Sequence, residues 1–512
     1  MRSPMPNYIL AIDQGTTGST ALIVNQQGAT IGRHTVEFPQ HFPQPAWVEH
    51  EPSDIWRSVE EAVTGALQSA SISASALAAI GITNQRETTL VWDRASGIPL
   101  QRAIVWQDRR TAEVCAKLRD EGATDDVRTR TGLVIDPYFS ATKIAWILDH
   151  VPGARERGER GDLAFGTVDS FLVYKLTGGS AHVTDISNAS RTLLMNLRTG
   201  AWDDTLLKRF FVPRAMMPTI VGSAEVVGKT RGVSFLPDGI PISGIAGDQQ
   251  AALFGQCCFD VGDAKCTYGT GAFVLMNIGP QPTLSRHGLV TTVAWKIGSS
   301  ITYALEGSAF IAGAAIQWLR DGLGIIRSAS EVEALAASVP STDGVVFVPA
   351  LAGLGAPYWD ADARGAILGL TRGSTAAHIA RATLEGVAFE VRDLLAAMGA
   401  EAAADGEPKL KRLRVDGGAS RNGLMMQFQA DISDILVDRP REIESTGRGA
   451  AMLAGVGSRL FPAPNEPSGK QALSQMRKVE ATFAPTMSTA GRAQALAKWH
   501  HGVAQVRLRA ES

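Results

Sequence analysis

The segment 11–21, AIDQGTTGSTA, is the feature of this sequence that most limits how the chain can fold. A run of strand-forming residues leads into Asp13, a turn rich in glycine and threonine follows, and the strand-forming run 21–24 comes directly after it. The glycine spacing fits neither the dinucleotide pattern G-x-G-x-x-G nor the phosphate-loop pattern G-x-x-x-x-G-K-[ST]. The segment therefore predicts a β-hairpin with an acid beside its turn.

A second copy of this plan lies in the latter half of the chain. Residues 265–276, KCTYGTGAFVLM, again form a predicted strand, a Gly-Thr-Gly turn and another strand. Such self-similarity over a long period indicates related structural units. Together with helical patterns at 55–67 and 376–398, it predicts an α/β protein built from two related halves. The small-residue stretch 307–319 predicts a further helix.

Composition excludes several classes of function. The chain has 512 residues, and its 49 basic and 51 acidic side chains give a net charge of -2, which supplies no field to attract nucleic acid. No segment offers the ~18–20 uncharged apolar residues of a membrane span, and the N-terminus lacks a secretory signal pattern. We therefore expect a cytoplasmic protein without nucleic acid binding or membrane insertion. The cysteines lack metal-ligand spacing and are predicted to be buried thiols: Cys115, Cys257, Cys258 and Cys266.

Three loops carry the residue types that bind a nucleotide. The turns 13–17 and 269–271 offer backbone N–H groups and threonine hydroxyls, which suit phosphate oxygens. Asp13 would repel a phosphate unless a cation lay between them, and Mg²⁺ binds one or two carboxylates together with phosphate oxygens. The loop 413–422 ends a strand in a double glycine, where a base or ribose can approach the backbone. Taken singly, each loop also fits a purely structural turn, and Ser420 or Asn422 would then cap the next helix.

The order of these loops resembles the carbohydrate kinase family, which belongs to the actin-like, ribonuclease-H-like ATPase superfamily. Two longer stretches, 138–150 and 365–385, resemble the two signatures of that family. The resemblance implies an α/β fold with two ribonuclease-H-like domains, in which mixed sheets are flanked by helices and the active site lies in the cleft between the domains. The implied parts are an N-terminal domain at 7–254 with most of the acceptor site, a C-terminal domain at 255–460 with most of the nucleotide site, and a linker and helical tail at 461–512.

Five stretches are similar to those members of the family that phosphorylate glycerol. They are GITNQRET (81–88), VWQDRRTAE (105–113), GLVIDPYFS (132–140), TDISNASRT (184–192) and ISGIAGDQQAALFGQ (242–256). The implied reaction transfers the γ-phosphoryl group of ATP to glycerol and yields ADP and sn-glycerol 3-phosphate. The resemblance assigns the glycerol contacts to Arg86, Glu87, Trp106, Tyr138, Asp248, Gln249 and Phe273.

The chemistry of these residues suits a short polyol, which needs donors, acceptors and flat apolar walls. Arg86 supplies donors and Glu87 supplies acceptors, while Trp106 and Phe273 would hold the carbon atoms between two rings. Phosphoryl transfer also needs a carboxylate that accepts the hydroxyl proton and aligns the attacking oxygen with the γ-phosphate. The resemblance gives this role of catalytic base to Asp248.

The remaining predicted contacts belong to Mg-ATP. The resemblance implies that Asp13 and Asp248 bind Mg²⁺. It implies that the phosphates lie on Thr16, Thr17, Gly18 and Thr270, and the nucleoside on Gly313, Gln317, Gly418 and Asn422. Because the sequence lacks a phosphate-loop lysine, backbone dipoles and the metal must supply most of the electrostatic stabilisation.

The sequence departs from the family pattern at two places, and it leaves two alternative functions open. Thr20 stands where many glycerol-specific members have a basic residue near the phosphates. The stretch 228–239 lacks the pattern associated with inhibition by fructose 1,6-bisphosphate, so we expect weak or absent control by that sugar phosphate. The alternatives are a kinase of another polyol or sugar, such as xylulose or gluconate, and an actin-like ATPase that uses nucleotide only to change shape. The resemblance further implies domain closure and a homodimer or homotetramer.

Overall fold

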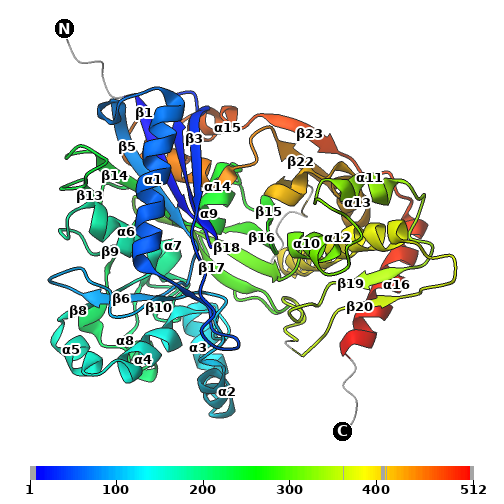
Figure 1. Ribbon diagram of the computed structural model, residues 1–512, viewed down its shortest axis with the longest axis horizontal. Coiled ribbons are helices and arrows are strands. Elements are labelled where there is room, and N and C mark those ends of the chain that lie inside the picture. The colour runs from blue at the N-terminus through cyan, green and yellow to red at the C-terminus, as the bar shows by residue number, and fades with distance from the viewer. Residues whose placement is uncertain (1–6, 361, 405–409, 411, 508–512) are drawn as a thin grey trace.

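The computed structural model describes residues 7–360, 362–404, 410 and 412–507. Its first half is built on a mixed sheet with the strand order β13-β14-β5-β1-β2-β3 (Figure 1). β1 and β2 form the predicted antiparallel hairpin, whereas β1 pairs in parallel with β5, and β5 with β14. The strands are β1 (Tyr8–Gln14), β2 (Gly18–Val24), β3 (Thr30–Glu37), β5 (Leu77–Asn84), β13 (Gly228–Lys229) and β14 (Pro241–Gly247).

The second half repeats this plan in a sheet with the order β17-β18-β16-β15-β21-β22-β23. β15 and β16 form the second predicted hairpin, and β15, β21 and β22 run parallel, as β1, β5 and β14 do in the first sheet. The prediction of an α/β fold with two related mixed sheets is therefore confirmed. The strands are β15 (Ala264–Tyr268), β16 (Ala272–Gly279), β17 (Val290–Ile297), β18 (Ser300–Ala309), β21 (Arg412–Asp416), β22 (Leu436–Pro440) and β23 (Val479–Phe483).

The predicted helix at 307–319 is wrong in its first part. Strand β18 continues to Ala309, and helix α10 begins only at Gly313 and ends at Asp321. The small residues serve sheet packing instead, because a Cβ atom at Gly307 would lie 2.7 Å from the side chain of Leu394 in the helix that covers this strand. Tertiary packing here overrides a helical composition.

Helices α9 (Asp248–Gly255) and α14 (Ser445–Gly457) lie between the two sheets (Figure 1). Glycines allow their close approach, since a Cβ atom at Gly449 of α14 would lie 1.8 Å from the carbonyl oxygen of Ala251 in α9. A buried cluster joins both helices to the strands of the two sheets, with Ala11 and Leu22 from the first sheet and Leu275 from the second. Helix α14 also contacts β1, β5 and β14, so this packing holds these three strands in place.

Other helices cover the outer faces. The first sheet is covered by α1 (Pro52–Ala70) and α6 (Val168–Leu176), and the second by α12 (Ala376–Ala404), α13 (Gly423–Ser433) and α11 (Glu331–Ala337). An insertion beside the first sheet contains α2 (Ala112–Asp120), α3 (Thr124–Thr131), α4 (Ser140–His150), α5 (Ala154–Arg160), α7 (Ile186–Ala189) and α8 (Asp204–Arg209). Among the described residues, no helix combines the length and the apolar character that a membrane span requires.

The C-terminal segment contributes more than the expected linker and helical tail. Strand β23 pairs with β22 and extends the second sheet, and it lies between α15 (Gly469–Gln475) and α16 (Thr489–Arg507). Trp499 of α16 is fully buried, and its ring stacks on Phe389 with a centroid distance of 5.1 Å. The segment thus covers the backbone edge of β22, whose N–H and C=O groups would otherwise be unpaired. Residues 508–512 of the predicted tail lie outside the described residues.

Candidate active site

The predicted acceptor residues meet where three parallel strands of the first sheet end. Arg86 and Glu87 follow β5, and Asp248 is the first residue of α9, directly after β14. In open α/β sheets, ligands bind outside the carboxyl ends of the strands. An acceptor pocket of about 160 Å³ lies here, and all the predicted glycerol contacts line it. Its lining is Thr16, Arg86, Glu87, Trp106, Gln107, Tyr138, Asp248, Gln249, Thr270, Gly271, Phe273 and Phe310.

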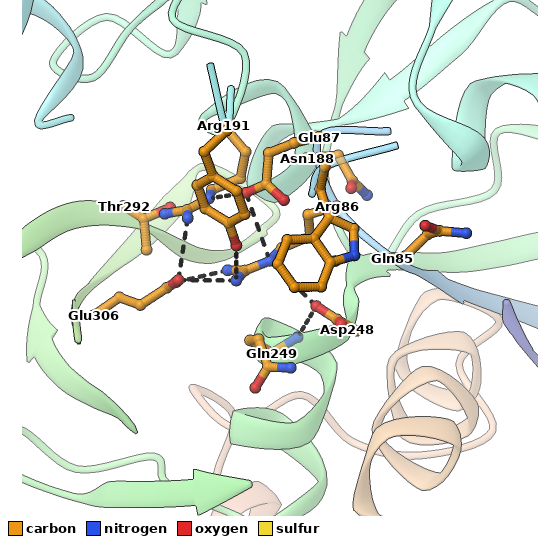
Figure 2. Close-up of polar contacts among 12 residues, drawn as sticks. Gln85, Arg86, Glu87, Asn188, Arg191, Asp248, Gln249, Thr292 and Glu306 are labelled. Carbon is orange, nitrogen blue, oxygen red and sulfur yellow. Dashed lines mark hydrogen bonds and ion pairs between the residues drawn. The ribbon is translucent and has the colours of Figure 1, made fainter. Parts of the chain in front are cut away.

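Arg86 is buried and held by several acceptors at once (Figure 2). Its Nη1 and Nη2 atoms donate to the two carboxylate oxygens of Glu306 at 2.6 and 2.8 Å. Its Nε atom lies 3.2 Å from Oδ1 of Asp248, and Nη2 lies 3.4 Å from the hydroxyl of Tyr138. Although burial opposes the charge, the carboxylates of Glu306 and Glu87 raise the pKa of Arg86 well above its ordinary value. The guanidinium is therefore charged and fixed in orientation.

Glu87 reaches the same pocket because the strand has ended before it. Adjacent residues in an extended strand face opposite sides, but β5 ends at Asn84 and Glu87 has a φ of 62°, in the left-handed region. Its carboxylate accepts a hydrogen bond of 2.6 Å from Nε of Arg191, while burial raises its pKa and Arg191 opposes that rise. A non-glycine residue in this conformation is uncommon and marks a position that the surrounding structure holds in place.

The aromatic walls form a corner, and this differs from the expected sandwich. The ring of Trp106 meets Phe273 at an interplanar angle of 80° and Tyr138 at 81°, with centroid distances of 6.4 and 5.6 Å. Edge-to-face contact satisfies the ring quadrupoles better than a face-to-face sandwich does. Nε1 of Trp106 also donates a hydrogen bond of 2.9 Å to Oγ1 of Thr16 and so joins this wall to the first hairpin.

The predicted nucleoside residues line a second pocket of about 450 Å³, the nucleotide pocket, between the turn 269–271, the start of α10 and the start of α13. Thr270 lines both pockets and so connects them. Asn422 also has the structural role considered above, because its side chain accepts a 2.8 Å hydrogen bond from the amide of Met425 and caps α13. The predicted residues brought together here are Thr270, Gly313, Gln317, Gly418 and Asn422.

Residues of the first hairpin have different roles: one lines the acceptor pocket, and others make contacts within the sheet and the turn. Thr16 lines the acceptor pocket, whereas the described linings of the two pockets do not include Thr17 or Gly18. Gly18 closes the turn, since its carbonyl oxygen accepts a 2.9 Å hydrogen bond from the amide of Gly15. Thr20 is bonded across the sheet to the hydroxyl of Thr35 at 2.9 Å. The assignment of phosphate contacts to Thr17 and Gly18 therefore stays a prediction.

Asp13 lies in an environment that suits a divalent cation. Burial, followed by the carboxylates of Glu444 and Asp248, raises its pKa well above the ordinary value, and Arg33 opposes that rise. A cation between Asp13 and Asp248 would remove this repulsion. The described residues contain no group of three or more His, Cys, Asp or Glu side chains placed to hold a metal. One or two carboxylates that share the ion with phosphate and water are what Mg²⁺ prefers.

Sequence reasoning missed three charged groups around the acceptor pocket. Glu306 and Arg191 contact Arg86 and Glu87, and buried Lys265 donates to the side-chain oxygen of Gln249. The signal was present in the sequence, because Glu306 is the single charged residue of strand β18 and Lys265 is the single charged residue of strand β15. Such residues need partners when the strand is buried. The partners themselves come from distant segments, so the sequence did not reveal them.

Known proteins with similar sequences and folds indicate the family of this chain. Models of the FGGY family of carbohydrate kinases match residues 8–255 with the N-terminal domain and residues 264–458 with the C-terminal domain. A glycerol kinase of Myxococcus xanthus is 54% identical over 98% of this chain and 99% of that protein. The crystal structure of Plasmodium falciparum glycerol kinase with ADP superposes with a TM-score of 0.90 at 33% identity and covers both chains fully. A xylulose kinase of Lactobacillus acidophilus shares the fold, with a TM-score of 0.84 at 20% identity over 97% of each chain.

These matches agree with the two halves of the molecule, each built on one sheet. The family models cover both halves, and the similarity to the Myxococcus xanthus protein runs through nearly the full length of both chains. The chain therefore belongs to the FGGY family of carbohydrate kinases.

Proposed function

We propose that this protein transfers the γ-phosphoryl group of ATP to glycerol and releases ADP and sn-glycerol 3-phosphate. The observation that carries the proposal is the acceptor pocket, in which one arginine, two carboxylates and four aromatic rings surround a small cavity that Thr270 connects to the nucleotide pocket. This donor set and volume suit a short polyol. The nearly full-length similarity to glycerol kinases supports the choice of glycerol over a larger sugar.

Asp248 acts as the base in this proposal. Its Oδ1 atom is held by the amide of Gln249 at 2.7 Å and by Nε of Arg86 at 3.2 Å. With Oδ1 held in this way, Oδ2 is the oxygen that we assign to the acceptor hydroxyl, and the side chain is 30% exposed, so it is open to the pocket. The proton of the hydroxyl moves to the carboxylate as the oxygen attacks the γ-phosphorus, and the β–γ bond breaks to release ADP.

Arg86, Glu87 and the aromatic corner orient the acceptor. A charged donor and a charged acceptor at the end of β5 fix two hydroxyl groups, and the rings of Trp106 and Phe273 contact the carbon atoms. The third hydroxyl then lies at Asp248, beside the nucleotide pocket. Because the acceptor is already oriented toward the nucleotide, the reaction no longer depends on a chance encounter, and such positioning can supply a large part of the lowering of the activation barrier.

Asp13 and Asp248 would hold Mg²⁺ in this site, and the turn 269–271 would hold phosphate oxygens. When bound, Mg²⁺ neutralises charge on the transferring phosphoryl group. The turn contributes the Thr270 hydroxyl and backbone N–H groups, which do not reorganise as charge develops. We further propose a cytoplasmic enzyme that closes its two halves over the substrates, assembles as a homodimer or homotetramer and responds weakly to fructose 1,6-bisphosphate.

The test is ADP release by the purified protein with Mg-ATP and glycerol, xylulose, gluconate or no acceptor. We expect turnover with glycerol to exceed the other rates. Asp248→Asn should lower kcat by about 10²–10⁴, the usual range for loss of a general base. Glycerol should still raise the Tm of this variant. Preference for xylulose or gluconate would favour a kinase of a larger acceptor, and equal rates without acceptor would favour the ATPase alternative.

A further inference from the structure

A buried network of two arginines and two glutamates extends from the wall of the acceptor pocket into the protein (Figure 2). It consists of Arg86, Glu87, Arg191 and Glu306, whose side chains are only 1–2% exposed. Glu306 accepts from both nitrogens of the Arg86 fork and, at 3.1 Å, from Nη2 of Arg191. Arg191 also donates to Glu87 at 2.6 Å. Each glutamate thus shares its charge between two arginines, and the network as a whole is neutral.

The network joins the two halves of the molecule. Arg86 and Glu87 come from the end of β5 in the first sheet, and Arg191 follows α7 in the insertion. Glu306 lies inside the second sheet, where its backbone neighbours are Leu275 of β16 and Val290 of β17. A strand with neighbours on both sides cannot shift without breaking its ladders. The carboxylate of Glu306 is therefore a rigid reference point, supplied by the other half, for the arginine of the acceptor pocket.

The geometry of Arg86 shows what this reference point fixes. Glu306 occupies the edge of the guanidinium that carries Nη1 and Nη2, and such a fork-to-fork pair sets the plane of the group. The opposite edge then points at Asp248 through Nε, and Nη2 points at Tyr138, and both partners line the acceptor pocket. The contact of 3.4 Å with Tyr138 is long for a hydrogen bond, so a ligand oxygen can replace it.

Stability alone is a weak reason for such a network. Buried ion pairs often contribute no more to stability than well-packed apolar groups of similar volume. A role in orienting the side chains that line the acceptor pocket accounts for the contacts that the two arginines and two glutamates make. Although burial works against its charge, Arg191 and Arg86 lower the pKa of Glu306 to about 2, so the carboxylate stays ionised.

We propose that Glu306 is a positioning residue for glycerol binding, which fixes the guanidinium of Arg86 with its Nε edge toward the acceptor pocket, while Arg191 holds Glu306 and Glu87. This inference rests on the proposed glycerol kinase function. It adds that a residue outside the pocket, from the opposite half of the chain, sets the affinity for the acceptor and leaves the affinity for ATP unchanged.

The experiment compares Glu306→Gln and Glu306→Asp with a matched control, Glu401→Gln. Glu401 is also a buried carboxylate of the second half, it accepts from the Ser285 hydroxyl and the His287 amide, and it lines neither active-site pocket. Both Glu306 variants should raise KM for glycerol roughly tenfold to a hundredfold, since a shift of about 1 Å in a positioned group can cost that much. KM for ATP should stay unchanged. Glu401→Gln should change neither constant.

A binding measurement separates positioning from general damage. Glycerol should raise the Tm of the wild type and of Glu401→Gln but not of Glu306→Gln, whereas a nonhydrolysable ATP analogue should raise all three. A wild-type glycerol KM in Glu306→Gln would overturn the inference, as would equal changes in the constants for glycerol and ATP. If Glu306→Gln does not fold, Glu306→Asp decides, because it keeps the charge and moves only the carboxylate. Absence of glycerol-dependent ADP release by the wild type would instead overturn the proposed function.

Discussion

The acceptor pocket and the nucleotide pocket are built on different principles, although they share Thr270. The acceptor pocket encloses about 160 Å³ and contains the charged groups of Arg86, Glu87 and Asp248. The nucleotide pocket encloses about 450 Å³ and is lined by glycine-containing turns and helix starts. A small polyol offers only hydroxyl groups, so charged side chains must define its position. A nucleotide offers phosphates and flat rings, which backbone amides and glycines can accommodate.

This difference determines how each pocket should respond to mutation. In the acceptor pocket, a change of one charge leaves its partners buried and unpaired, so that effects spread through the network and are not additive. In the nucleotide pocket, an added atom acts by steric contact with its immediate neighbours. The following predictions test this contrast.

Arg86→Lys should have the largest effect among the four variants below. Lysine keeps the charge but loses the fork that binds Glu306 through two nitrogens. We expect KM for glycerol to rise on the order of a hundredfold, within the cost of breaking a buried hydrogen-bonded charge pair. Steady-state kinetics with varied glycerol at saturating ATP measures the change. A glycerol KM within a factor of a few of the wild type would mean that charge alone defines the acceptor pocket.

Gly313→Ala should weaken ATP binding through backbone contact. A Cβ atom at this position would lie 2.6 Å from the carbonyl oxygen of Gly269, so either the start of α10 or the turn 269–271 must move. Overpacking of this kind costs about 1–3 kcal/mol, and we expect KM for ATP to rise roughly tenfold. The glycerol-induced rise in Tm should persist. Loss of that rise would show that the two pockets do not respond separately.

Gly418→Ala separates contact with ATP from contact with the protein. A Cβ atom here would meet no atom within 4 Å among the described residues, although Gly418 lines the same pocket as Gly313. The Tm without ligand should therefore equal that of the wild type. If the nucleoside occupies this space, its affinity should fall by about 1 kcal/mol, the scale of one methyl group in a pocket. Calorimetric titration with ADP measures this, and unchanged affinity would place the nucleoside away from Gly418.

Trp106→Phe should have the smallest effect and should involve both substrates. The substitution removes the hydrogen bond between Nε1 and the hydroxyl of Thr16, which links the aromatic wall to the first hairpin. One such bond contributes about 0.5–1.5 kcal/mol, so we expect kcat/KM to fall only severalfold. The fall should occur when either glycerol or ATP is varied. A fall confined to glycerol would indicate that Trp106 serves only as a wall of the acceptor pocket.

Particular elements show how far the sequence could predict the fold and the site. The two Gly-Thr hairpins were predicted because short-range turn chemistry determines them, and the duplicated α/β fold is confirmed. The helix predicted at 307–319 was wrong in its first part, because Gly307 lies in strand β18 and packs against the neighbouring helix α12. Asn422 shows that two readings of one residue can both hold, since it caps α13 and lines the nucleotide pocket.

The sequence by itself determined the family, the two hairpins and many of the residues that line the two pockets. These properties depend on residue types at short spacings, which are visible along the chain. Tertiary structure alone decided that Glu306 meets Arg86, that Arg191 meets Glu87, and that the aromatic rings form a corner. The reason is physical: a buried charge requires a partner, but burial leaves open which distant segment provides it. The packing of α9 and α14 between the two sheets holds the two halves together.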